Sequence, residues 1–525
     1  MALLSFAASS RAQSQVAFKP DQAANTAGAP ARQVISDVDL PPLSKNGLWF
    51  ASIMGKNQNL IRIWDTRTER VAQRIRIPNT TVTAIAFSPD SRRLAAIGDM
   101  GLAIFDVESG EKLQQFAEHH SATGEMIFAP DGKSVFVSTI DSVRQVDFQT
   151  GKVRSSIPYP STPDGIQQLC LLSLSAAGDL LASTTDSGIH VYRVADGTQV
   201  RHIAFGDPKP SYYSVLISPT GLLIATMSVD SSISLWEVNS GHEVAQIRSD
   251  FTVPNSIGFS PDSRFLAAST ADSVVVFDAL NGEPRIEYSL DNDEGDDFVA
   301  ERVGFSSDSR QLVALIRDPE RTVPRRQSWD VSALFPATKA GASPTSADDA
   351  FTAQDFAQCW DSLGSRDARL AMQAMRKLVD HPQVATSMLE RQLREAETTV
   401  PSQDDLELEA SLRKLDHESF AVRERAAQLL RSAGRFAEPL LNRALQNRPT
   451  YEVKQRIDRL LEELSDARRA KSYQRVRAVN ALELIDSEES HRTVRWAAES
   501  TDQPEVQAEA NSAAARMARK HTPKP

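Results

Sequence analysis

The sequence predicts a seven-bladed β-propeller followed by an α-helical domain, and two observations lead to this fold class. An apolar run that ends in an aromatic or apolar residue plus a mostly acidic one recurs seven times between residues 60 and 330. Successive endings lie 41 to 52 residues apart, close to the period of about 40–45 residues of four-stranded propeller blades. After residue 350 the apolar residues recur with the period of a helix.

The seven endings share one place in their repeats, at the close of the expected third strand of each blade. They are Trp64-Asp65, Phe105-Asp106, Val146-Asp147, Tyr192-Arg193, Trp236-Glu237, Phe277-Asp278 and Trp329-Asp330. Because the tryptophans stand at repeat-defining positions, we expect them to belong to the blade core and not to a ligand-stacking platform.

A second motif, a turn of the type Ser-Pro-Asp-Ser or Ala-Pro-Asp-Gly or a variant of it, recurs ahead of the last six endings. Examples begin at Ser88, Ala129 and Ser260. Proline presets φ, and Asp or Gly tolerates a tight reversal, so the apolar runs on either side of each turn predict a β-hairpin. A third strand, a turn that contains glycine and a fourth strand complete each expected blade.

With these motifs the chain resembles a seven-bladed WD-repeat β-propeller over residues 33–335. The resemblance implies that an aspartate in the turn before each third strand anchors the blade through hydrogen bonds. The aspartates near that place are Asp99, Asp141, Asp186, Asp230, Asp272 and Asp318. The Gly-His dipeptide of the family is missing from its usual place, so a Tol-Pal-type propeller remains the competing interpretation.

The last repeat ends at residues 326–336 without the glycine turn and the fourth strand that follow the other endings. An unpaired outer strand favours aggregation. We therefore expect the apolar stretch 33–41 to close the ring as the outer strand of the last blade. Residues 1–32 are expected to be a disordered N-terminal segment, and residues 336–350, rich in Ala, Ser, Thr and Pro, a flexible linker.

Residues 351–525 predict an α-helical domain. In its clearest part, residues 419–464, Gly434 ends one helix, Pro439 opens a second and a third follows; further helices are expected to restart at residues 475 and 504. Helix pairs of this size resemble HEAT-like repeats, which stack into solenoids. The whole arrangement resembles uncharacterised WD-repeat proteins of planctomycetes, which implies a soluble bacterial protein without an established activity.

Composition narrows the classes of function. Residues 1–350 contain 30 basic and 41 acidic residues, which accounts for the whole net charge of −11, and residues 351–525 contain 28 of each. General binding of nucleic acid is not expected from such an acidic propeller. No apolar run approaches the roughly 18–20 residues of a membrane-spanning helix. The start, MALLSFAASSRAQSQ, fits either a cytoplasmic protein or an exported one with a truncated signal peptide.

Motifs for catalysis, cofactors or metals are absent from the sequence, so we expect no catalytic residue, no cofactor and no metal ion. The favoured function is a non-catalytic protein–protein interaction scaffold that uses the propeller loops and the helical surface. The alternative is a propeller enzyme, or a sensor of a small molecule or metal, with its site in the central channel. Partner identity and oligomeric state stay open.

The expected contact surface consists of the loops that lead into the first strand of each blade. Its candidate partner-binding residues are Tyr159, Tyr212, Tyr213, Asp293 and Asp296. Aromatic side chains are enriched at the centres of interfaces. Two other interpretations stay open: the tyrosines pack over neighbouring loops, or the acidic run 291–297 holds calcium.

Overall fold

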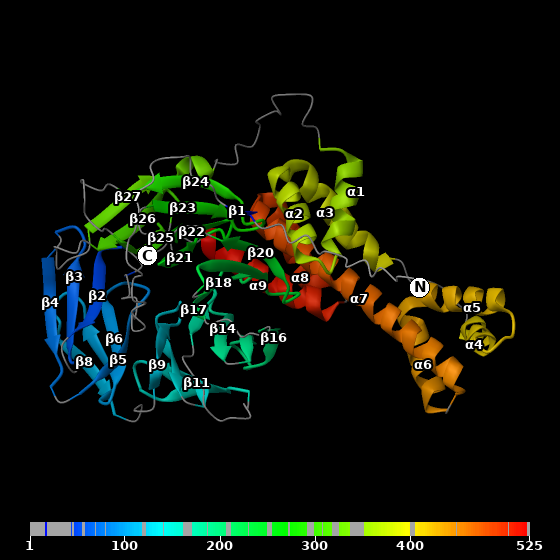
Figure 1. The fold of residues 1–525 in the computed structure, drawn as a ribbon, viewed down its shortest axis with the longest axis horizontal. Coiled ribbons are helices and arrows are strands. Elements are labelled where there is room, and N and C mark those ends of the chain that lie inside the picture. Colours follow the sequence, from blue (N-terminus) through cyan, green and yellow to red (C-terminus); the bar gives the residue numbers. More distant parts are fainter. Residues whose placement is uncertain are drawn as a thin grey trace, which may run out of the picture. The chain divides into compact units, whose positions relative to one another are not determined.

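The computed structural model divides into two compact units, Met1–Ala340 and Gly341–Pro525 (Figure 1). It describes residues 16–17 and 44–521, apart from a set of gaps. The gaps are 45–46, 55–57, 69, 79, 118–121, 140, 161–170, 186, 206–211, 229, 249–254, 271–272, 291–298, 307, 318–324, 336–350, 399–404, 448 and 502. In the described residues the first unit contains the strands and the second contains the α-helices.

Seven sheets follow one another along the first unit, antiparallel except for one short added strand, and each forms one blade of a propeller. Blade 1 consists of β2 (Trp49–Met54), β3 (Leu60–Asp65) and β4 (Arg70–Arg76). Blade 2 consists of β5 (Val82–Phe87), β6 (Arg93–Gly98), β7 (Gly101–Asp106) and β8 (Lys112–Phe116). Blade 3 consists of β9 (Ala122–Phe128), β10 (Ser134–Thr139), β11 (Ser142–Asp147) and β12 (Val153–Pro158). Blade 4 consists of β13 (Leu172–Leu174), β14 (Leu180–Thr185), β15 (Gly188–Arg193) and β16 (Gln199–Ala204). Blade 5 consists of β17 (Tyr212–Ile217), β18 (Leu223–Ser228), β19 (Ser232–Glu237) and β20 (Glu243–Arg248).

Blade 6 consists of β21 (Ser256–Phe259), β22 (Phe265–Ser269), β23 (Ser273–Asp278) and β24 (Pro284–Ser289). Blade 7 consists of β25 (Val299–Phe305), β26 (Gln311–Arg317) and β27 (Arg325–Asp330). The two-residue strand β1 (Val16–Ala17) pairs in parallel with β20, and the short 3-10 helix η1 (Ser332–Leu334) follows β27. The fold class that the repeats predict is thus confirmed.

Blades 1 and 7 contain three strands each in the described part of the chain. The Trp-Asp endings at residues 64–65 and 329–330 close β3 and β27, so blade 1 shows its second to fourth strands and blade 7 its first three. Ser44 supports this assignment, because its amide donates to the Trp49 carbonyl as the Ser88 amide donates to the Arg93 carbonyl in blade 2. The stretch 33–41, expected to close the ring, lies outside the described residues and stays a prediction.

The turns between first and second strands satisfy their own polar groups. In blade 2, Ser88 Oγ donates to Asp90 Oδ1 at 2.5 Å and accepts the Arg93 amide at 2.9 Å. Asp90 Oδ1 also accepts the Arg92 amide, at 3.1 Å. The same contacts recur at Ser260 and Asp262 in blade 6 and at Ser306 and Asp308 in blade 7. The repeated Ser-x-Asp spacing is therefore a turn motif that lets each hairpin reverse.

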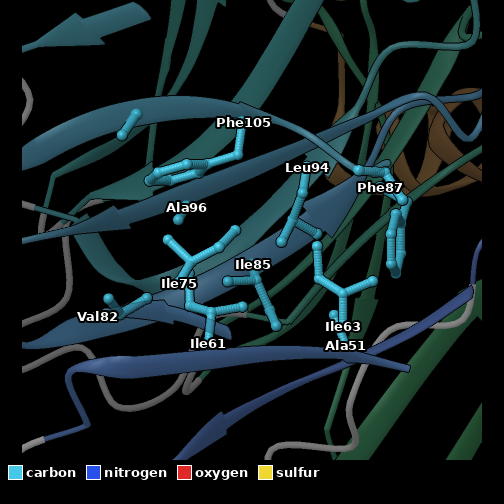
Figure 2. Close-up of a cluster of buried hydrophobic side chains, with 12 residues drawn as sticks. Ala51, Ile61, Ile63, Ile75, Val82, Ile85, Phe87, Leu94, Ala96 and Phe105 are labelled. Atoms are coloured by element: carbon cyan, nitrogen blue, oxygen red, sulfur yellow. The ribbon is translucent and has the colours of Figure 1, made fainter. Parts of the chain in front are cut away.

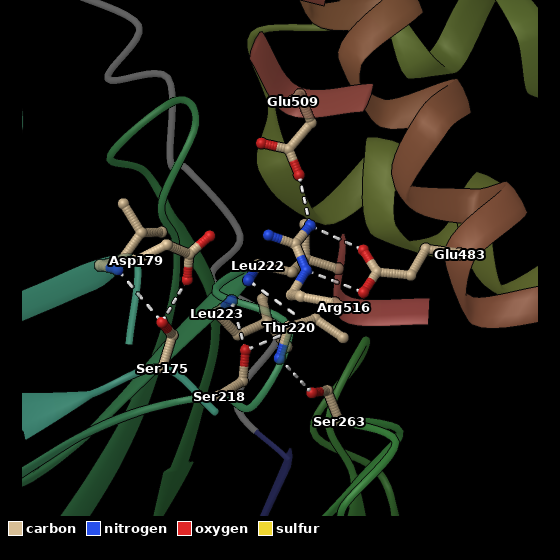
Figure 3. A network of polar contacts seen from close by, with 11 residues as sticks. Ser175, Asp179, Ser218, Thr220, Leu222, Leu223, Ser263, Glu483, Glu509 and Arg516 are labelled. Carbon is tan, nitrogen blue, oxygen red and sulfur yellow. Dashed lines mark hydrogen bonds and ion pairs between the residues drawn. The ribbon is translucent and has the colours of Figure 1, made fainter. Parts of the chain in front are cut away.

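Turns of neighbouring blades also contact one another. The Thr220 amide of blade 5 donates to Ser263 Oγ of blade 6 at 3.0 Å, as Figure 3 shows. The Ala176 amide of blade 4 donates to the Pro219 carbonyl of blade 5 at 3.1 Å. These bonds join separate blades through backbone amides of the turns, so they stabilise the ring in addition to the packing of the blade faces.

Neighbouring blades pack face to face through branched aliphatic and aromatic side chains. Between blades 1 and 2, Ile61 and Ile63 lie against Ile85, Leu94 and Phe105 (Figure 2). Full burial of each such side chain contributes about 1.5–3 kcal/mol. Middle strands such as β10 and β18 are buried along their whole length because both faces of the blade are covered.

The acidic residue that ends a third strand caps the turn that follows. Asp106 Oδ1 accepts the amides of Glu108 at 3.1 Å and Ser109 at 2.8 Å. Gly110, with a φ of 72°, donates its amide to the Asp106 carbonyl at 2.9 Å. The side chains of Asp65, Asp147, Asp278 and Asp330 accept backbone amides in the same way. These acidic positions therefore stabilise the blade itself.

The tryptophan before the acidic residue is held inside its blade. Trp236 Nε1 donates to Thr226 Oγ1 at 3.1 Å, and Trp64 Nε1 lies 3.5 Å from Ser52 Oγ. Trp64 is 4% exposed, and its ring packs with apolar side chains of blades 1 and 7. Repeat-defining aromatic residues at these two places therefore pack in the propeller.

Asp147 in blade 3 makes its turn sensitive to acid. Its carboxylate accepts a hydrogen bond from Arg154 Nη2 at 2.5 Å and the Thr150 amide at 2.8 Å. The Arg154 guanidinium, followed by the Thr150 amide, lowers the pKa of Asp147 to about 2. Since this pKa lies below the value of roughly 3.9 in an unfolded chain, the stabilising contribution is complete above about pH 4 and is lost as the pH falls toward about 2.

We expect Asp147→Asn to lower the urea midpoint of propeller unfolding at pH 7, with a deficit that shrinks between pH 4 and pH 2.5. The deficit shrinks because the wild-type carboxylate then becomes protonated and loses its ionic contacts as well. Circular dichroism at pH 7, 4, 3 and 2.5 measures it. Glu111→Gln, at an exposed turn position of blade 2, is the control and should leave the midpoint unchanged. A deficit of equal size at every pH contradicts the conclusion that the ionised Asp147 carboxylate stabilises this turn.

The described part of the second unit contains helices α1 to α9, which are drawn in yellow-green to red in Figure 1. They are α1 (Ala353–Leu363), α2 (Ala368–Asp380), α3 (Pro382–Thr398), α4 (Asp405–Lys414), α5 (Phe420–Ala433), α6 (Ala437–Gln446), α7 (Tyr451–Ile485), α8 (Glu488–Ser500) and α9 (Pro504–His521), with the 3-10 helix η3 (Gly434–Phe436) between α5 and α6. None of the described helices combines the length and the apolar character that a membrane-spanning segment needs.

The expected end of α5 at Gly434 is confirmed, whereas the expected break after residue 464 is wrong. Gly434 stands at the C-cap of α5 with a φ of 56°. α7 runs on without interruption for 35 residues, through the polar stretch 465–474. This stretch contains neither Gly nor Pro and is rich in Ala, Arg and Lys, which favour helix. The lack of an apolar face there does not interrupt the backbone.

α7 takes part in two cores. Its first half packs Ile457 and Leu460 against Leu430 of α5 and Leu441 of α6. Its second half contacts α1, α2, α3, α8 and α9. The fully buried Arg477 lies in this second half and donates to the carbonyls of Leu363 at 2.5 Å and Ser365 at 2.6 Å, beside the end of α1. The long helix therefore joins two groups of helices into one unit.

Candidate functional site

The structure does not describe the side chains of three of the five expected partner-binding residues. Asp293 and Asp296, with the rest of the acidic run 291–297, lie outside the described residues. Tyr213 belongs to β17, but the structure describes only its backbone. The proposal that these residues contact a partner therefore stays a prediction.

Tyr159 is placed between blades 3 and 4. It is 8% exposed, and its ring packs with Phe136, Leu172 and Tyr192. Its hydroxyl lies 3.1 Å from Ser138 Oγ. This burial leaves little of the ring accessible to a partner, so Tyr159 holds a place in the packing of the propeller.

Tyr212 is half-buried at the start of β17. Its ring centroid lies 4.9 Å from that of Phe205. Burial raises the pKa of the Tyr212 hydroxyl, and a hydrogen bond with Thr226 acts in the opposite direction. Because Thr226 also accepts Trp236 Nε1, one threonine links a first-strand tyrosine to the third-strand tryptophan of blade 5. Part of Tyr212 remains accessible to a partner.

The aspartates expected to anchor the blades lie between second and third strands wherever the structure describes them. Asp99 accepts the Thr81 amide at 3.1 Å. Asp141 accepts the hydroxyls of Thr139 at 2.7 Å and Ser142 at 2.8 Å. In blade 5, Asp230 accepts both the amide and the hydroxyl of Ser232, at 3.1 and 2.6 Å. Asp186, Asp272 and Asp318 lie outside the described residues.

The sequence reasoning missed a group of charges on the inner strands. Glu125 lies on β9 of blade 3, and Glu301 and Arg302 lie on β25 of blade 7. Burial lowers the pKa of Arg302 to about 10, while the charges of Glu125 and Glu301 act in the opposite direction. Glu125 Oε2 also accepts the Leu172 amide of blade 4 at 2.8 Å. The sequence signal that could have revealed this group is the presence of charged residues within the mostly apolar first strands β9 and β25.

This group lies near the axis of the propeller. Blades 3 and 7 are separated by two blades on one side and three on the other, so their inner strands approach each other only around the axis. Glu125 and Arg302 are close enough to interact electrostatically. In the described residues, no three His, Cys, Asp or Glu side chains are grouped so that they could hold a metal ion.

Comparison with known proteins finds WD-repeat relatives of the propeller, whereas no model of a protein family matches the chain. Periodic tryptophan protein 2 of Arabidopsis thaliana is 29% identical over 244 residues, 46% of this chain and 26% of that protein. An uncharacterised WD repeat-containing protein of Synechocystis is 31% identical over 143 residues, 27% of this chain and 39% of that protein. Pre-mRNA-processing factor 19 of Dictyostelium discoideum is 22% identical over 292 residues, 50% of this chain and 56% of that protein.

The chain thus spans between 26% and 56% of the length of these three relatives. Among solved structures, the β-propeller domain of Myceliophteria thermophila Cps50 (Swd1) aligns with a TM-score of 0.42 and 16% identity, over 55% of this chain and 96% of that domain. The resemblance to planctomycete proteins stays a prediction. The chain is a relative of WD-repeat proteins, with a seven-bladed propeller of that type followed by a helical region.

Proposed function

We propose that this protein is a non-catalytic scaffold that binds other proteins through its propeller and its helical unit. The observation that supports this function is the pairing of a WD-type propeller with a second compact unit in one chain. The recurring polar residues of the propeller are used in turns and caps, as Ser88, Asp90 and Asp106 illustrate. Propellers and helical repeats both offer extended surfaces for partners.

Two binding units in one chain allow bivalent capture of an assembly. Binding through one unit raises the effective concentration of the other at the same assembly, so the intact chain binds more tightly than either part. Residues 336–350, between the two units, are expected to serve as the connection. Tyr212, Tyr213, Asp293 and Asp296 remain the proposed contacts of the propeller.

The test is an affinity purification from native cell extract, read by mass spectrometry, with the intact chain and with residues 1–340 and 341–525 as separate baits. We expect a reproducible set of proteins with the intact chain and a smaller recovery of the same set with each part. Circular dichroism of each part checks that it is folded. Equal recovery by one part alone contradicts bivalent capture, and an extract without specific partners contradicts the scaffold function.

A second candidate function is the binding of a small charged molecule at the propeller axis. The observation that favours it is the group formed by the buried Glu301 and the half-buried Glu125 and Arg302, which places charges of both signs on inner strands. The purification separates the two candidates, because a ligand of this kind leaves the bait without reproducible protein partners.

A further inference from the structure

Arginines of blade 1 lie beside one another on a single face of the sheet. Arg62 on β3 stands directly opposite Arg74 on β4, and Arg76 stands opposite Leu60 on the same face. Like charges that face each other across two strands destabilise a sheet. An anion beside Arg62 and the exposed Arg74 would therefore stabilise this part of the sheet.

The same face of blade 1 is turned toward blade 7. Trp64, two residues beyond Arg62, packs with Phe50 and with Leu315 of β26. Leu315 stands opposite Arg326 on β27, so Arg326 lies on the face that blade 7 turns toward blade 1. We call Arg62, Arg74, Arg76 and Arg326 the seam cluster, because they border the seam between the first and the last blade.

Hydrogen bonding in the seam cluster is incomplete. The Nε atoms of Arg62 and Arg326 are buried and have no hydrogen-bond partner within the described part of the chain. Two other propeller arginines meet a carboxylate, Arg67 with Asp65 at 2.9 Å and Arg285 with Asp278 at 2.9 Å. The Arg62 guanidinium lies 5.9 Å from the centroid of the Trp64 ring, and the buried Nε of Arg264 in blade 6 also has no hydrogen-bond partner among the described residues, but Arg264 stands alone. A buried guanidinium nitrogen without an acceptor is costly. Two of them along one seam, beside the exposed Arg74 and Arg76, make this seam favourable for an anionic ligand.

We propose that the seam between blades 1 and 7 binds an acidic, extended peptide segment of a partner protein. This inference rests on the proposed scaffold function and names the chemistry of one partner. Carboxylates at every second residue of an extended segment lie on one side, about 7 Å apart. They can face Arg62, Arg74 and Arg326 together, and each guanidinium offers a fork of donors that matches a carboxylate.

Charge favours a peptide over a nucleic acid as the ligand. Residues 1–350 carry 41 acidic and 30 basic residues, so a long polyanion is repelled by the surroundings of the seam cluster. Nucleic-acid binding depends on many phosphate contacts along a basic surface. Four arginines at one seam suit a short acidic segment better.

The test measures fluorescence anisotropy of a labelled eight-residue peptide of alternating Asp and Thr with the full-length protein at low salt. We expect saturable binding, which Arg74→Gln and Arg326→Gln each weaken about tenfold, the loss of one charge-assisted hydrogen bond. The matched control is Arg70→Gln, because Arg70 stands opposite Asp65 and thus on the other face of the same strand. It should bind the peptide like wild type. Thermal unfolding verifies that every variant is folded.

Three outcomes overturn the proposal: equal binding of a matched Asn-Thr peptide, equal weakening by Arg70→Gln, or stronger binding of a single-stranded oligonucleotide than of the acidic peptide. A fourth outcome that would overturn the proposal concerns two carboxylates of the chain itself, Asp37 and Asp39. If the double variant Asp37→Asn, Asp39→Asn binds the peptide more tightly than wild type, these carboxylates compete for the seam, and an external partner is not its ligand. Protein partners in the purification without peptide binding overturn this inference alone and leave the scaffold function standing.

Discussion

Glu483→Gln is expected to destabilise the helical unit by about 3 kcal/mol, the cost of breaking a buried ion pair on one side. Glu483 on α7 accepts Arg516 of α9 through two bonds, Nε to Oε1 at 2.8 Å and Nη2 to Oε2 at 2.7 Å (Figure 3). The two side chains are 1% and 5% exposed. The substitution keeps the shape of the side chain but removes the negative charge of Glu483, while Arg516 keeps its ion pair with Glu509 at 2.7 Å.

Two further variants distinguish charge from packing at this pair. Glu509→Gln should cost about 1 kcal/mol or less, because Glu509 is 22% exposed and makes one contact with Arg516. Replacing Glu483 and Arg516 together by methionine should restore most of the stability, since a buried pair exchanged for apolar residues is often neutral. Urea unfolding followed by circular dichroism at 222 nm measures all three. A cost below about 1 kcal/mol for Glu483→Gln would contradict a desolvated pair.

Gly101→Ala is expected to cost the propeller about 3 kcal/mol or more. Gly101 begins β7 with a φ of 82°, and a Cβ built there would lie 2.1 Å from the Phe116 carbonyl oxygen. The backbone conformation alone costs an L-residue about 1–2 kcal/mol, and forcing an atom into a packed place adds about 1–3 kcal/mol. Phe116 pairs with Leu102 in the sheet, so its carbonyl cannot retreat without opening blade 2.

The matched control for Gly101 is Gly132→Ala. Gly132 lies in a turn of blade 3 with a φ of 66°, and the nearest atom to its Cβ would be Pro89 Cδ at 3.7 Å. Only the backbone term applies there, so the cost should be about 1–2 kcal/mol. Urea unfolding followed at 218 nm compares the two variants. Equal costs would show that the contact with Phe116 is relieved by a small shift and that the steric argument is wrong.

Much of the propeller was predictable because its signals are local. The turn that begins at Ser88 and the ending at Phe105-Asp106 act within a few residues, through side-chain bonds to nearby amides. The same holds for the end of α5 at Gly434. Such contacts repeat wherever the same residues repeat, so a reader of the sequence can count blades and locate a helix end.

The continuity of α7 was missed because its polar middle carries no apolar stripe to mark a helix, although its residues favour one. The group of Glu125 and Arg302 was missed because the two residues are far apart in the chain and come close only where the inner strands converge. Tyr159 was expected in an accessible loop, yet packing between blades 3 and 4 buries it. The charged group and the burial of Tyr159 both depend on contacts between distant segments.

The sequence by itself determined the repeat, the number of blades and the order of the two units, since periodicity and turn chemistry act over short distances. Only the tertiary structure decided which charges are buried together. Arg62 and Arg326 stand 264 residues apart and face one seam because the ring brings its first and last blades side by side. Glu483 and Arg516 meet because α7 packs against α9. Long-range packing sets these encounters, and no local pattern records them.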